Sequence, residues 1–131
     1  MRNILKITFV ILLTTCSLLN AQTLRDIEGN VYGMITIGTQ TWMTENLKTT
    51  KFNDGTQIPI VTDNTEWSNL TTAAYCWYNN KDTAYSKVFG ALYNWHSVNT
   101  GKLCPSGWHV PTDFEWNTFL NYLGGAESAA G

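Results

Sequence analysis

The feature that most constrains this chain is a helix near its C-terminus whose start and stop are both marked in the sequence. Thr112 is a favoured N-cap residue, and Glu115 three positions later completes a capping box. Apolar residues then recur at i, i+3, i+4 and i+7, which gives the helix one apolar stripe; the stripe comprises Trp116, Phe119, Leu120 and Leu123. Gly124 is a typical C-terminal stop. The sequence therefore predicts a helix over 113–123 that packs on the rest of a domain.

The first 21 residues have the pattern of an export signal. Arg2 and Lys6 supply a short positive region, an apolar run follows, and Ala21 is a small residue of the kind that signal peptidase accepts. The apolar run is too short to span a bilayer. The alternative is a lipoprotein signal, because residues 13–16 (LTTC) resemble a lipobox, with lipid attached to Cys16. Both interpretations place the protein outside the cytoplasm, and membrane contact is expected only through a lipid at Cys16.

The charge balance disfavours nucleic acid as a partner. The whole chain has 8 basic and 10 acidic residues, and the loss of Arg2 and Lys6 leaves 6 against 10, a net charge of −4. A chain of this charge with no basic cluster lacks the groups that contact phosphates. Residues 22–131 are enough for one domain.

The remaining pattern predicts an α+β fold. Turn signals at 28–30 (EGN), 38–40 (GTQ) and 53–55 (NDG) separate short strands between residues 24 and 61. A short helix is expected over 63–70, with Asp63 or Asn64 as its cap, and a strand over 73–78.

A second amphipathic helix is expected over 87–98, with Leu92, Trp95 and Val98 facing inward. The predicted fold therefore has short antiparallel strands and two main helices, 87–98 and 113–123.

Four segments carry a resemblance to a known family. They are residues 26–59 (DIEGNVYGMITIGTQTWMTENLKTTKFNDGTQIP), 75–80 (YCWYNN), 89–104 (FGALYNWHSVNTGKLC) and 104–116 (CPSGWHVPTDFEW). In this order they resemble the Fibrobacter succinogenes major paralogous domain, a large bacterial family of secreted or surface-attached proteins. That family in turn is similar to the C-type-lectin-like fold of the formylglycine-generating sulfatase-modifying enzymes, whose LPTEAEWE-type segment resembles residues 110–116. The resemblance implies a C-type-lectin-like fold that continues with several strands past Gly131, so residues 22–131 are expected to be the N-terminal part of one domain.

Cys76 and Cys104 are the two cysteines after the export signal. In an oxidising compartment such a pair suggests a disulfide, which stabilises a domain by about 2–4 kcal/mol. The alternatives are two buried thiols, or a bond from one of them to a cysteine past Gly131. A catalytic thiol needs a neighbouring base, and the spacing places neither His96 nor His109 beside a cysteine.

No catalytic or metal-binding constellation stands out. His109, Asp113 and Glu115 are close in sequence, but the two acids occupy a first helical turn, so we interpret them as structural. The active cysteines of the formylglycine-generating enzymes lie toward their C-terminal part, which has no counterpart here. We therefore expect neither enzyme activity nor a cofactor.

The aromatic residues are the remaining candidates for function. Trp77, Trp95 and Trp116 lie on predicted core positions, whereas a second set is less constrained and is our candidate ligand-contact set: Trp42, Trp67, Tyr78 and Trp108. The hypothesis is a secreted or surface-displayed binding or adhesion module for a polysaccharide, another cell-envelope component or a cell-surface protein. The alternatives are a diverged enzyme of the formylglycine-generating type and a structural envelope protein.

Overall fold

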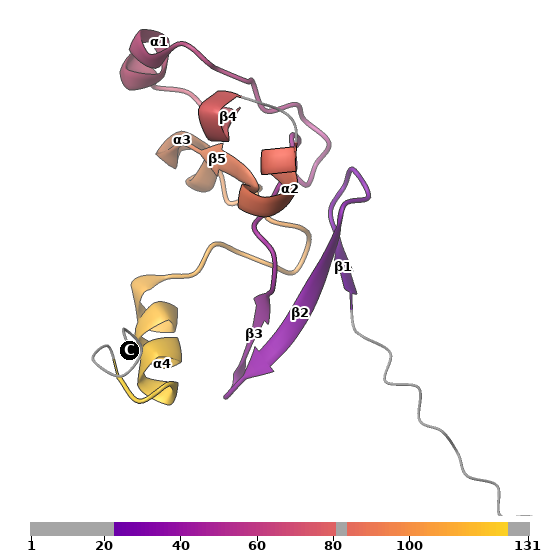
Figure 1. The fold of residues 1–131 in the computed structure, drawn as a ribbon, viewed down its shortest axis with the longest axis vertical. Coiled ribbons are helices and arrows are strands. Elements are labelled where there is room, and N and C mark those ends of the chain that lie inside the picture. Colours follow the sequence, from indigo (N-terminus) through magenta and orange to yellow (C-terminus); the bar gives the residue numbers. More distant parts are fainter. Residues whose placement is uncertain (1–22, 81–83, 126–131) are drawn as a thin grey trace, which may run out of the picture.

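The computed structural model describes residues 23–80 and 84–125 and has the predicted α+β class (Figure 1). The elements in chain order are β1 Thr23–Arg25, β2 Val31–Ile37, β3 Gln40–Met43, α1 Asn64–Asn69, β4 Tyr75–Trp77, the 3-10 turn η1 Tyr78–Asn80, α2 Ala84–Phe89, β5 Ala91–Tyr93, α3 Trp95–Val98 and α4 Asp113–Tyr122. The predicted export signal, including Cys16, lies outside the described residues. Within the described ranges, no helix has both the length and the apolar character that crossing a membrane requires.

Two small antiparallel sheets form the β part of the fold. β1, β2 and β3 make a meander in which Arg25 pairs with Val31 and Ile37 pairs with Gln40. The turns predicted at 28–30 and 38–40 connect these strands. β4 and β5 form the second sheet, with Cys76 opposite Leu92. Figure 1 shows this second sheet among the short helices α1, α2 and α3, while the meander lies beside α4.

The hydrophobic core lies around the second sheet. Its buried members are Phe52, Ile58, Tyr75, Trp77 and Leu103. The rings of Tyr75 and Trp77 meet edge to face, with centroids 5.4 Å apart and planes at 82°. The prediction that Trp77 is a core residue is confirmed.

A network of carboxylates and hydroxyls fastens the first hairpin to the following segment. Asp26 accepts hydrogen bonds from the backbone of Glu28 and Asn30, from the Asn30 side chain and, at 2.7 Å, from the hydroxyl of Tyr32. The same hydroxyl accepts a bond of 3.2 Å from the Lys48 backbone N–H. Burial raises the pKa of Tyr32, whose side chain is fully enclosed at 0% exposure. These bonds join residues 26–32 to the segment that enters the core.

The prediction of one helix over 87–98 is wrong. The chain turns at Gly90, with φ 67°, and continues as β5 and then as the separate helix α3. A Cβ atom at Gly90 would lie 2.5 Å from the carbonyl oxygen of Leu47, so this position combines a left-handed backbone with close backbone packing. Leu92 and Trp95 are consequently exposed, Trp95 at 68%, while Val98 does pack against the core.

Two other local predictions are confirmed. Asp63 caps α1 by accepting a bond of 2.8 Å from the Glu66 backbone. The strand predicted over 73–78 is observed as β4, and it ends before Asn79 and Asn80, whose φ values are 53° and 52°. Asparagine is one of the few residues that tolerate this left-handed conformation.

Candidate binding surface around helix α4

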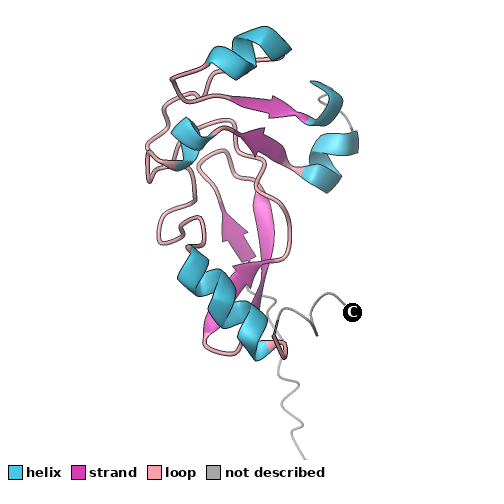
Figure 2. Cartoon of the chain, turned by 90° about the vertical axis from the view of Figure 1, so that its left-hand side faces the viewer, coloured by secondary structure: helices cyan, strands magenta, loops and turns pink. Residues whose placement is uncertain are grey.

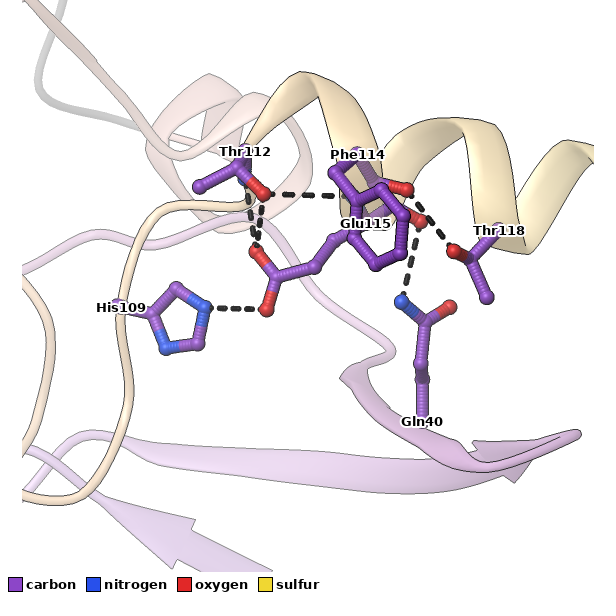
Figure 3. Close-up of polar contacts among 6 residues, drawn as sticks. All are labelled: Gln40, His109, Thr112, Phe114, Glu115 and Thr118. Atoms are coloured by element: carbon purple, nitrogen blue, oxygen red, sulfur yellow. Dashed lines mark hydrogen bonds and ion pairs between the residues drawn. The ribbon is translucent and has the colours of Figure 1, made fainter.

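Helix α4 begins with the predicted capping box (Figure 3). The Thr112 hydroxyl accepts a bond of 3.3 Å from the Glu115 backbone N–H, and the Glu115 carboxylate accepts one of 2.8 Å from the Thr112 backbone N–H. Both bonds satisfy N–H groups that a helix start otherwise leaves without partners. The start of α4, at Asp113, is therefore set by its own sequence, whatever packs against the helix.

The carboxylate of Glu115 also binds His109 in the preceding loop. The Nε2 atom of His109 lies 2.7 Å from Oε1 of Glu115, which ties the loop to the first helical turn. Hydrogen bonds from the Thr112 backbone, and then from His109, lower the pKa of Glu115 to about 2. Over the described parts of the chain, no group of three or more His, Cys, Asp or Glu side chains is placed to hold a metal ion. In the structure, His109 and Glu115 therefore bind each other and hold the loop before α4 against the start of the helix.

Helix α4 lies against strand β3 through aromatic rings and one amide. The ring centroid of Trp42 is 4.9 Å from those of both Trp116 and Phe119, and Trp116 meets Phe119 edge to face at 5.9 Å and 83°. The side-chain amide of Gln40 donates a bond of 3.1 Å to the Glu115 carbonyl oxygen (Figure 3). We call Trp42, Trp116 and Phe119 the Trp42 cluster.

The prediction that Trp116 is a core residue is wrong. Its side chain is 46% exposed, and no residue of α4 is buried. The described residues cover the helix only in part, chiefly through Trp42 on β3, so one side of the apolar stripe, including Leu123, faces outward from them. A packed tryptophan ring that stays half exposed on a partly covered helix is typical of an interaction surface.

The structure does not bring the four predicted contact residues together. Trp42 is half-buried on β3, Trp67 is half-buried on α1, Tyr78 is exposed beside the ring of Phe89, and Trp108 is half-buried in the loop before α4. Figures 1 and 2 both place α1 and α4 at opposite ends of the molecule. Trp42 and Trp67 therefore belong to different surfaces.

The two cysteines are free thiols in the structure, so the predicted disulfide is not formed there. Cys76 lies on β4, and the backbone carbonyl of Cys104 accepts a bond of 3.0 Å from the side chain of Asn53. Burial raises the pKa of both thiols, which keeps them protonated near neutral pH. A protonated thiol is a poor nucleophile.

Sequence reasoning missed a cleft on the other side of α4. It has a volume of about 380 Å³ and is lined by residues 37–40 and by Thr118, Asn121 and Tyr122. The spacing of the last three, at i, i+3 and i+4, places them on one side of the helix and away from the apolar stripe. The sequence signal for this cleft is Tyr122, an aromatic residue on the otherwise polar side of the helix.

A comparison with protein-family models gives one result that bears on identity. Residues 35–131 match the family model described as the Fibrobacter succinogenes major domain, a stretch that includes the end of β2, the core around the second sheet and α4. Searches of curated proteins and of solved structures found no significant match to the chain. On the match to the family model, the chain belongs to the Fibrobacter succinogenes major domain family.

Proposed function

We propose that this chain is an extracytoplasmic binding module, secreted or displayed on the bacterial surface, that holds a polysaccharide or another cell-envelope component on the Trp42 cluster. The observation that carries the proposal is Trp116, which belongs to a packed aromatic cluster and is nevertheless 46% exposed. The export pattern of residues 1–21 supports the location. Attachment through a lipid at Cys16 remains the alternative to free secretion.

The geometry of the Trp42 cluster suits binding because its rings are held in place before a ligand arrives. Phe119 lies edge to face with Trp116, and Trp42 packs against both rings. An immobilised ring loses little conformational freedom on binding, so more of its contact energy contributes to affinity. A flat ring can stack on a sugar or cover an apolar side chain of a surface protein.

Two features favour binding over catalysis. The thiols of Cys76 and Cys104 have raised pKa values, and a nucleophilic cysteine needs the opposite shift. His109, the histidine nearest to α4 in sequence, is engaged by Glu115 at 2.7 Å. We therefore rank a binding module above a diverged formylglycine-generating-type enzyme and above a structural envelope protein. The C-type-lectin-like architecture, with further strands after Gly131, stays a prediction from the resemblance.

Cosedimentation of the full chain with insoluble polysaccharides and bacterial cell-wall fractions tests the proposal. We expect Trp116→Ala to reduce the bound fraction at least fivefold on whichever fraction binds, and Trp42→Ala to do the same. Trp95→Ala is the matched control. It makes the same chemical change on another surface, because Trp95 lies on α3 and is 68% exposed. Equal binding by Trp116→Ala and Trp95→Ala would contradict the proposal. Trp108→Ala tests in the same assay whether the loop before α4 contributes.

A further inference from the structure

We draw no further inference here: the strongest candidate, the partly covered apolar stripe of α4 beside the outer edge of strand β3, carries none, because nothing in the described part of the chain shows what covers it.

Discussion

Replacing Tyr32 with phenylalanine isolates the polar network that fastens the first hairpin. The ring of Tyr32 is fully buried, so Tyr32→Phe keeps its packing and removes only the hydroxyl. The carboxylate of Asp26 then loses its 2.7 Å hydroxyl donor, and the backbone N–H of the half-buried Lys48 loses its acceptor at 3.2 Å. A buried hydrogen bond to a charged group contributes about 1.5–3 kcal/mol, and a buried group left unpaired costs a similar amount.

We therefore expect Tyr32→Phe to lower the free energy of unfolding by about 2 kcal/mol. In a domain of this size that corresponds to a fall in Tm of about 8–16 °C. Urea unfolding followed by tryptophan fluorescence measures the change, with an unaltered m value as the sign that only stability changed. Tyr122→Phe is the matched control, because its hydroxyl lies on an exposed side chain and its loss should cost less than about 0.5 kcal/mol. Equal stabilities of the two variants would refute the reasoning.

The other two predictions concern the core and the start of α4. Ile58→Ala should destabilise the chain by about 2–5 kcal/mol in the same assay, because Ile58 is 1% exposed. Ile60→Ala is the control and should cost well under about 1 kcal/mol, because Ile60 is 51% exposed. Equal losses of stability in the two variants would contradict the position of Ile58 in the core. The lowered pKa of Glu115, about 2, means that its ionised form stabilises the fold above its ordinary pKa of 4.5, and that this contribution is lost as pH falls from 4.5 through 2. Thermal melts from pH 2 to 7 should therefore show a smaller loss of Tm on acidification in Glu115→Gln than in the parent chain, and parallel curves would contradict this cause.

The features that sequence predicted correctly are those fixed within a few residues. The capping box joins positions three residues apart, and the cap of α1 spans Asp63 to Glu66, so each is readable without knowledge of the fold. The turn between β2 and β3 is likewise set by the local residues around Gly38. The core position of Trp77 follows from the apolar, aromatic strand in which it lies, and the structure confirms it.

The features that sequence missed depend on contacts between distant segments. Apolar residues recur with a helical period in 87–98, but this segment is not one helix. Gly90 packs against Leu47, and the chain there forms a turn followed by a strand. Two residues in the sequence argue against a continuous helix: Gly90 within the segment, and Asn94, which caps α3. The exposure of Trp116 was missed for a related reason, because a stripe predicts that a helix packs and does not say how much of it is covered. The bonds from Tyr32 to Lys48 and from Gln40 to Glu115 join residues 16 and 75 positions apart, and no local pattern announces them.

The indole N–H resonances of the six tryptophans provide the most direct test of the account. Each gives its own signal in a ¹⁵N–¹H correlation spectrum, and single Trp→Phe variants assign them. Soluble fragments of the cell-envelope fraction that retains the chain should shift the signals of Trp42 and Trp116 and leave those of Trp67 and Trp95 in place. Shifts confined to Trp67 or Trp95, at a distance from α4, would contradict the claim that this protein binds its ligand on that helix.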